Sequence, residues 1–289
     1  MLRLPRDEFL TDFWDYRPGE HVSFIEPTQQ GKTYLMYQCL DAAMNQNSQL
    51  QTVSLMPKPK DPATVYWKDQ LGLKEIAVWP PSKWFWETEP RGYVLWPKHI
   101  PDNEDANRLN LNRTFARCFN DQYWQGDSIT VADDVYLHAV LYGLNSELER
   151  HWTAGSGGGA GLWSANQKPS GTLGGGSVSS FSYNAPTHLF LGKDRDERNI
   201  KRFGEIGGID PHEVESVVRN LKMARIGDHA ISEKLYIDKR GPYMCIVGWL
   251  GELCLLQMHF SIPLPLTGLR TFITCTLWQT RPISATGLR

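Results

Sequence analysis

The chain has 289 residues, of which 41% are hydrophobic and 21% charged, so it is long enough to bury a sizeable core in one large or two small domains. Its net charge of −2 excludes a global positive field for binding nucleic acid. A local basic surface remains open, because net charge says nothing about how charges are distributed.

Cysteine usage predicts a reducing compartment. The chain has five cysteines, at positions 39, 118, 245, 254 and 275. Their number is odd and no two have C-x-x-C spacing, which argues against a disulfide framework or a zinc site. The start of the chain carries acids where a signal peptide needs an apolar run, and no stretch supplies about 20 apolar residues for a membrane span. We therefore expect a cytoplasmic protein.

Hydrophobic periodicity predicts strands that alternate with helices along the chain. Strands are expected at 21–26, 50–56, 75–80, 92–96, 128–134, 159–167 and 187–192. Helices are expected from residue 32 to the polar run at 45–49 and at 62–72, 103–124, 135–150, 194–204 and 211–220. This order predicts an α/β fold with a mostly parallel central sheet and helices on both faces, in which ligands bind at the carboxyl ends of the strands.

Composition divides the chain into three parts: a lead-in at 1–20, a main domain at 21–248 and an atypical apolar tail at 249–289. The tail has few charges and little periodicity, so it is either a docking or swapped segment or sequence without a folded role. Two Gly/Ser-rich stretches, 153–161 and 169–180, are flexible linkers or loops near the site, and the strands that flank them favour loops.

A strand–loop–helix early in the chain has the features of a phosphate-binding loop. Gly31, Lys32 and Thr33 complete the second half of the pattern G-x-x-x-x-G-K-[ST], but Glu26 stands where the first glycine belongs. Helix-start N–H groups bind anions, a lysine reaches the phosphates and a hydroxyl binds Mg²⁺. We expect nucleotide contacts from Thr28, Gln29, Gln30, Gly31, Lys32, Thr33 and Tyr34. The alternative is an ordinary exposed turn.

Two later strands end in polar groups that suit the same site. Asp133 and Asp134 end the strand at 128–134, where Asp133 is the candidate Mg²⁺ ligand and Asp134 the candidate base or water-orienting group. Gln167 ends the next strand, and its amide can donate to a γ-phosphate while accepting from the attacking water. Taken singly, the two acids are better explained as the end of a strand and the cap of the helix that starts near Val135, and Gln167 as a residue of a surface turn before Pro169.

The order of these motifs resembles that of the FtsK/HerA-type P-loop ATPases, RecA-like NTPases with an additional strand, and is most similar to small phage-encoded ATP-binding proteins. The resemblance covers roughly residues 20–248. It rests on EPTQQGKTYL, SLMPKPKDP, SITVADDVYL, GLWSANQKPS and HLFLGKDRDERNIKRFGEIGG, with the Gln-Lys-Pro-Ser run as the most specific match.

The resemblance implies ATP and Mg²⁺ as cofactors, double-stranded DNA as a partner and a homo-oligomer, with a hexameric ring as one arrangement. It implies a phosphate and magnesium role for Lys32 and Thr33. Asp133 is then the Walker B acid, Asp134 the catalytic carboxylate and Gln167 the sensor.

Three departures separate this chain from that family. Glu26 replaces a glycine, Asp134 is one methylene shorter than the glutamate found in many ATPases, and AGSGGG stands where a basic turn is usual. We therefore keep two hypotheses, an ATP-hydrolysing DNA motor and a nucleotide-binding structural or regulatory subunit with little or no hydrolysis. A charge at Glu26 repels nucleotide unless it points away or pairs with a base, so Glu26→Gly is expected to tighten ATP binding.

A basic run follows the strand at 187–192. Arg195, Arg198 and Arg202 are candidates for an arginine finger that acts on a neighbouring subunit. The alternative is a solvated helix face, because acids alternate with the bases in this segment.

Overall fold

The computed structural model describes residues 1–82, 90–169, 172–173, 176–206, 209–223, 232–241 and 243–248, all within one compact unit that spans Met1–Gly251. The expected atypical tail at 249–289 lies outside the described residues. None of the helices in the described ranges is long and apolar enough to cross a membrane.

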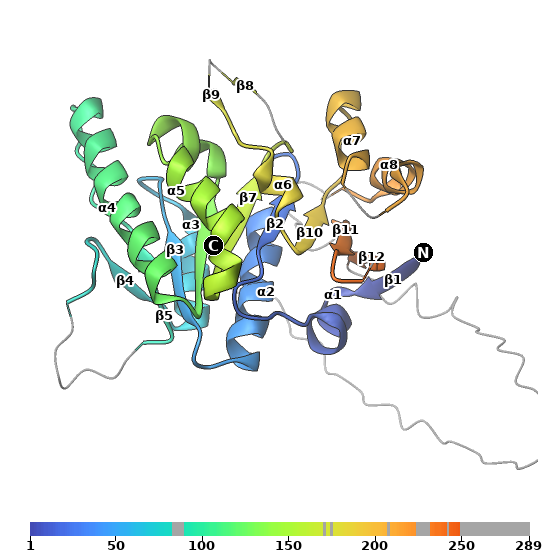
Figure 1. The fold of residues 1–289 in the computed structure, drawn as a ribbon, viewed down its shortest axis with the longest axis horizontal. Helices are drawn as coiled ribbons and strands as arrows, with labels where there is room; N and C mark the ends of the chain where they lie inside the picture. Colours follow the sequence, from blue (N-terminus) through green and yellow to red (C-terminus); the bar gives the residue numbers. More distant parts are fainter. Residues whose placement is uncertain are drawn as a thin grey trace, which may run out of the picture. The chain divides into compact units, whose positions relative to one another are not determined.

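A ten-stranded sheet runs through the molecule in the order β1-β12-β11-β10-β2-β7-β6-β3-β5-β4 (Figure 1). The strands are β1 (Leu2–Pro5), β2 (Val22–Ile25), β3 (Gln51–Leu55), β4 (Lys74–Ile76), β5 (Gly92–Leu95), β6 (Ser128–Asp133), β7 (Ala160–Asn166), β10 (His188–Leu191), β11 (Lys234–Asp238) and β12 (Tyr243–Gly248). A separate antiparallel pair joins β8 (Thr172–Leu173) to β9 (Gly176–Ser177).

Helices and helical turns connect these strands. They are α1 (Arg6–Glu8), η1 (Phe9–Phe13), α2 (Lys32–Gln46), α3 (Pro62–Leu71), α4 (Glu104–Gln125), η2 (Leu137–Leu141), α5 (Asn145–Arg150), η3 (His151–Gly155), η4 (Ser156–Gly158), α6 (Phe181–Asn184), α7 (Glu197–Gly204) and α8 (Pro211–Asn220). The single helix expected at 135–150 is instead divided into η2 and α5 by a turn at Gly143, whose φ is +68°.

The expected α/β fold is confirmed. Every neighbouring pair from β10 across to β4 is parallel, and only β11 adds antiparallel pairing, to β10 and β12. The sequence analysis did not predict β1, β11 or β12. These three strands extend the sheet beyond β10, so the amino-terminal lead-in contributes an edge strand, β1, that pairs with β12.

Alternation along the buried strands divides the core between the two faces of the sheet. Ile129 and Val131 of β6 pack in the same cluster as Leu40 of α2, whereas Ala132 packs with Phe115 of α4. Successive side chains of a strand point to opposite faces, so helices cover both. A third cluster joins α7 and α8 to β10, β11 and β12.

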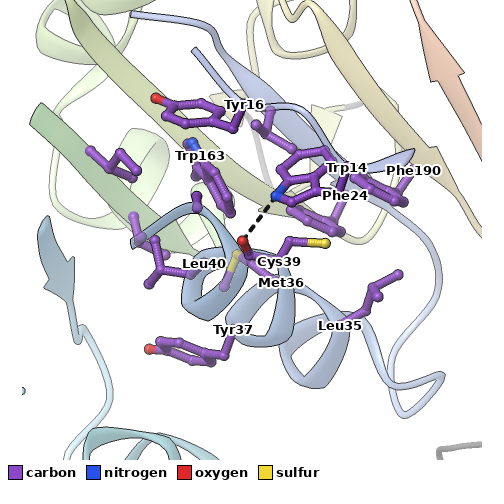
Figure 2. Close-up of a cluster of buried hydrophobic side chains, with 14 of the residues drawn as sticks. Trp14, Tyr16, Phe24, Leu35, Met36, Tyr37, Cys39, Leu40, Trp163 and Phe190 are labelled. Atoms are coloured by element: carbon purple, nitrogen blue, oxygen red, sulfur yellow. Dashed lines mark hydrogen bonds between the residues drawn. The ribbon is translucent and has the colours of Figure 1, made fainter. Parts of the chain in front are cut away.

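An aromatic cluster fastens the amino-terminal segment to the sheet and to α2 (Figure 2). Trp14 is 2% exposed, and its ring lies edge-on to Trp163 of β7 at a centroid distance of 5.7 Å. Its indole N–H donates to the Cys39 carbonyl of α2 at 3.0 Å, which satisfies the only polar atom of the ring (Figure 2). Phe24 and Phe190 stack at 4.6 Å in the same cluster. Residues before β2 therefore belong to the core.

Replacing Trp14 with alanine is expected to reduce the free energy of unfolding by about 3–5 kcal/mol, because it empties a packed site and removes the indole hydrogen bond to the Cys39 carbonyl. Urea unfolding followed by circular dichroism measures the change. Trp124 is 74% exposed and provides the matched control, for which Trp124→Ala is expected to stay within about 0.5 kcal/mol. Equal effects of the two substitutions would contradict this role of Trp14.

Candidate active site

The loop between β2 and α2 has the backbone of an anion-binding loop. β2 ends at Ile25, and α2 begins at Lys32 directly after Gly31. Gln29 has a φ of +63° and Gly31 a φ of +84°, so two residues of the loop have a left-handed backbone conformation. Glycine adopts this conformation without a steric cost, which favours it at position 31. The N–H groups of the first turn of α2 have no partners within the helix and are available to an anion.

Helix α2 and strand β6 meet through a hydrogen bond. The Thr33 hydroxyl donates to Oδ2 of Asp133 at 3.0 Å, across 100 positions of sequence. Asp133 is the last residue of β6 and is 4% exposed. The structure thus brings together the two residues that the sequence analysis assigned to Mg²⁺.

Burial and neighbouring groups have opposite effects on the charge of Asp133. Burial raises the pKa of Asp133 above its ordinary value, while the ammonium groups of Lys32 and Lys58 and the Thr33 hydroxyl oppose that rise. A divalent cation at this carboxylate would relieve the same cost. A hydroxyl and a carboxylate side by side fit Mg²⁺, which takes few protein oxygens and completes its shell with phosphate and water.

Lys32 lies across the loop that precedes it. Its Nζ donates to the Glu26 carbonyl at 3.4 Å, from the first position of α2 back to the start of the loop. This distance is at the long end for a hydrogen bond, and the side chain is only half-buried. The ammonium group therefore makes only a weak contact with the start of the loop, which a phosphate can replace.

Asp134 does not cap a helix, which was the alternative for this acid pair. It has a φ of +63°, and its Oδ2 lies 3.7 Å from Nζ of Lys58. A left-handed conformation costs free energy in a residue other than glycine and recurs at functional sites. The turn re-aims the chain directly after β6, so that Asp133 faces Thr33 and Asp134 faces the loop after β3.

Lys58 was not predicted, although it lies in the PKPK run. Two side chains fix its backbone: the Tyr142 hydroxyl donates to the Pro57 carbonyl at 3.0 Å, and Nε1 of Trp96 donates to the Lys58 carbonyl at 2.8 Å. Tyr142 follows η2 and Trp96 follows β5, so two separate segments hold this loop. The PKPK run could have marked Lys58 as a candidate site residue, but the sequence alone did not show that Lys58 lies beside Asp134.

Strand β7 lies between β2 and β6 and ends at the same edge of the sheet. Its register pairs Asn166 with Ile25 and Ala165 with Asp133. Gln167, the expected sensor, follows β7 and is exposed. The preceding Asn166 is 3% exposed, and its amide Nδ2 has no hydrogen-bond partner among the described residues. The strand end therefore carries two amides, of which sequence reasoning named one.

Comparison with protein-family models and with curated proteins gave no match. Among solved structures, the chain is similar to the genome packaging NTPase B204 from Sulfolobus turreted icosahedral virus 2 in complex with sulfate, with a TM-score of 0.53 and 12% identity over 82% of this chain and 100% of that chain. The same NTPase in complex with AMPPCP gives a TM-score of 0.51 and 12% identity over 81% and 100%. At this identity the likeness concerns the fold.

This chain has the α/β fold of the B204 NTPase, a RecA-like P-loop fold. The resemblance seen in the sequence is confirmed at that level. The strand order β2-β7-β6 places an additional strand between the strand of the P-loop and the strand that ends in the acid pair.

Glu26, at the first-glycine position of the P-loop, points away from the loop and pairs with a base. Its Oε2 lies 2.5 Å from Nζ of Lys234 in β11, and both side chains are 2% exposed. Burial raises the pKa of Glu26 and lowers that of Lys234, and the attraction between the two charges opposes both shifts. The expectation that Glu26→Gly tightens ATP binding required a carboxylate facing nucleotide, and the structure does not provide one.

The remaining P-loop residues divide by exposure. Thr28 and Gln29 are exposed, and Gln30 is half-buried. Tyr34 is 37% exposed and lies edge-on to Trp67 of α3, at a centroid distance of 4.9 Å. The loop thus offers its tip to solvent and anchors its two ends.

The candidate arginines lie on or beside α7. Arg195 and Arg198 are exposed, and Arg202 is half-buried. The neighbouring acids act locally: Asp194 accepts from the Asn199 amide at 2.7 Å, and Asp196 caps α7 by accepting from the Arg198 N–H at 2.9 Å. The acids are therefore engaged with the helix start, which leaves the assignment of a trans arginine finger a prediction.

The Gly/Ser stretch at 153–161 does not lie near the P-loop, contrary to expectation. It forms the end of η3, the turn η4 and the start of β7, and so meets the sheet at the amino end of that strand. Gly159 has a φ of +78°, and a Cβ there would come 2.9 Å from the Asp127 backbone nitrogen. These glycines permit close packing at the opposite edge from the site.

Replacing Asp133 with asparagine is expected to raise the thermal midpoint of the nucleotide-free protein, because it removes a buried carboxylate whose charge the fold disfavours. The same change is expected to abolish the increase in ADP affinity caused by Mg²⁺. Differential scanning fluorimetry and calorimetric titration measure the two effects. A lower midpoint would contradict a destabilising effect of the buried carboxylate, and intact Mg²⁺ dependence would contradict the role of Asp133 as a Mg²⁺ ligand.

Proposed function

We propose that this chain is a Mg²⁺-dependent ATPase that uses hydrolysis to move double-stranded DNA, as in genome packaging or transfer. We propose that it works as a homo-oligomer, with a hexameric ring as the arrangement to test, in the cytoplasm. The hydrogen bond between Thr33 and Asp133 carries the proposal, because it joins the P-loop helix to the acid strand. A chance Gly-Lys-Thr turn has no reason to meet a buried carboxylate from another strand.

The residues at this edge of the sheet suit distinct tasks. The P-loop N–H groups and Lys32 would bind the phosphates, and Thr33 and Asp133 would hold Mg²⁺. The bound Mg²⁺ would neutralise charge on the β- and γ-phosphate oxygens. Asp134 is the candidate base for the attacking water, and Gln167 the candidate sensor of the γ-phosphate. Gln167 is free to turn toward a ligand because it is exposed.

The proposed DNA partner rests on likeness in fold and on exposed positive charge. B204, whose fold this chain shares, is described as a genome packaging NTPase. The exposed Arg195 and Arg198 provide positive charge beyond the phosphate site, suited either to a neighbouring subunit's nucleotide or to a DNA backbone. We propose residues 21–248 as the motor domain.

A second function is a nucleotide-binding structural or regulatory subunit with little or no hydrolysis. The ion pair between Asp134 and Lys58 favours it, because a carboxylate oxygen that faces an ammonium group at 3.7 Å is not free to orient an attacking water. The short Asp134 side chain favours it as well. Under this proposal the site binds ATP and Mg²⁺, and the bound state itself is the signal.

The deciding experiment measures ATP turnover with and without double-stranded DNA, alongside the mass of the assembly. A DNA motor is expected to hydrolyse ATP faster with DNA and to lose this activity in Lys32→Ala, which removes the phosphate-binding charge. Nucleotide binding without turnover, with or without DNA, would contradict the motor hypothesis and support the regulatory-subunit hypothesis. Failure to bind ATP at all would sink both.

Substitution of Lys58 tests whether this cation serves hydrolysis or restrains it. Lys58→Met is expected to lower kcat at least tenfold with a similar Kd for ATP, because the site loses its cation beside Asp134, and Lys58→Arg is expected to retain most activity. Single-turnover hydrolysis and nucleotide titration separate the two quantities. Lys60→Met, an exposed lysine in the same loop, is the control. A faster Lys58→Met enzyme would instead assign the ion pair a restraining role.

A further inference from the structure

Two side chains from the β11 segment hold one carbonyl of the P-loop. Lys234 donates from Nζ to the Gln30 carbonyl at 2.7 Å, and the Ser232 hydroxyl donates to the same oxygen at 2.7 Å. Nζ of Lys234 also donates to Oγ of Ser232 at 2.9 Å, which closes the triangle. Lys234 and Ser232 are 2% and 1% exposed. These contacts link positions more than 200 residues apart and are shielded from water.

Glu26 holds the Lys234 ammonium group in this position. An isolated ammonium buried this deeply would lose its charge, and the carboxylate 2.5 Å away compensates it. Gly192, which follows β10, makes room for the pair: a Cβ at that position would clash with the Glu26 side chain. The departure from glycine at position 26 is therefore matched by a glycine at 192 and a lysine at 234.

The anchored carbonyl determines where the next N–H points. A trans peptide directs its C=O and N–H in opposite directions, and the only cis bond among the described residues is Trp79–Pro80. With the Gln30 oxygen turned toward β11, the Gly31 N–H points the other way, in the direction of β7 and β6 in the strand order. That is the side on which Thr33 meets Asp133. Among the described residues, no protein acceptor is found for this N–H.

We propose that Lys234, held by Glu26 and assisted by Ser232, is a positioning residue that aims the Gly31 N–H at the phosphate chain. The inference rests on the proposed nucleotide binding, but it needs neither hydrolysis nor DNA. In this protein Glu26 replaces the first glycine of the P-loop and forms a buried ion pair with Lys234, which in turn binds the Gln30 carbonyl. Lys234 and Ser232 act on the loop through the Gln30 carbonyl and are not proposed to contact the ligand.

Binding of inorganic pyrophosphate tests the proposal directly, measured by calorimetric titration with Mg²⁺ present. The double variant Glu26→Gln/Lys234→Met removes both charges together, so that neither is left buried alone, and its Kd is expected to rise about tenfold. Ser232→Ala is expected to raise Kd about threefold, and Ser232→Thr, which keeps the hydroxyl, to match the unmodified protein. Lys222→Met, at a side chain 61% exposed, is the control.

The Gly31 amide resonance supplies a readout that a general loss of packing would not reproduce. Labelling with ¹³C-carbonyl glutamine and ¹⁵N-glycine selects the two Gln-Gly pairs of the chain, at Gly31 and Gly126. Gly126 precedes β6 at the opposite edge of the sheet and serves as an internal control. Pyrophosphate is expected to shift Gly31 but not Gly126 in the unmodified protein, with a smaller shift in Ser232→Ala.

The outcomes separate this inference from the proposed function. Unchanged pyrophosphate affinity and an unchanged Gly31 shift in Ser232→Ala and in the folded double variant would overturn the positioning role alone. Should the double variant fail to fold, the Ser232 pair decides. Absence of pyrophosphate and ATP binding by the unmodified protein would overturn nucleotide binding and the role of Gly31 with it.

Discussion

Backbone hydrogen bonds hold β7 between β2 and β6, with all three strands running in the same direction. The carboxyl ends of the three strands therefore lie at one edge of the sheet, where the P-loop, the amides after β7 and the acid pair meet. Register completes the arrangement, because a slip of one residue would turn Asp133 away from α2 and toward the opposite face. The contact between Thr33 and Asp133 depends on this alignment.

The buried pair of Glu26 and Lys234 changes the meaning of the altered P-loop. Seen in sequence, an acid at the first-glycine position suggests a damaged site with a charge facing the phosphates. In the fold, the acid and its lysine form an ion pair that joins the end of β2 to the added strand β11. Such a pair contributes little net stability compared with apolar residues, but loss of one partner costs about 3–5 kcal/mol. It therefore constrains the two positions to change together.

Much of the fold and half of the site were predictable, for identifiable reasons. The core strands are short apolar runs, and the capping residues Asp61 and Asn103 mark the starts of α3 and α4. Strands β2, β3, β6 and β7 and helices α3 and α4 therefore lie within one or two residues of expectation. Strands β11 and β12 were missed, and Lys234 and Ser232 with them, because a lysine inside a strand gives no sign of burial. In α4, Leu109 is 48% exposed, whereas Leu111 is fully buried, so the packed face of this helix starts after its first turn.

By itself, the sequence determined the strand–loop–helix around Gly31, Lys32 and Thr33, the strand that ends at Asp133 and the alternation that makes the sheet parallel. These are local properties of periodicity, turn chemistry and apolar runs. Only the tertiary structure decided that Lys58 stands beside Asp134 and that Glu26 turns away from the loop onto Lys234. Both pairs join segments far apart in the chain. Their partners are chosen by which strands become neighbours, and no local pattern records that choice.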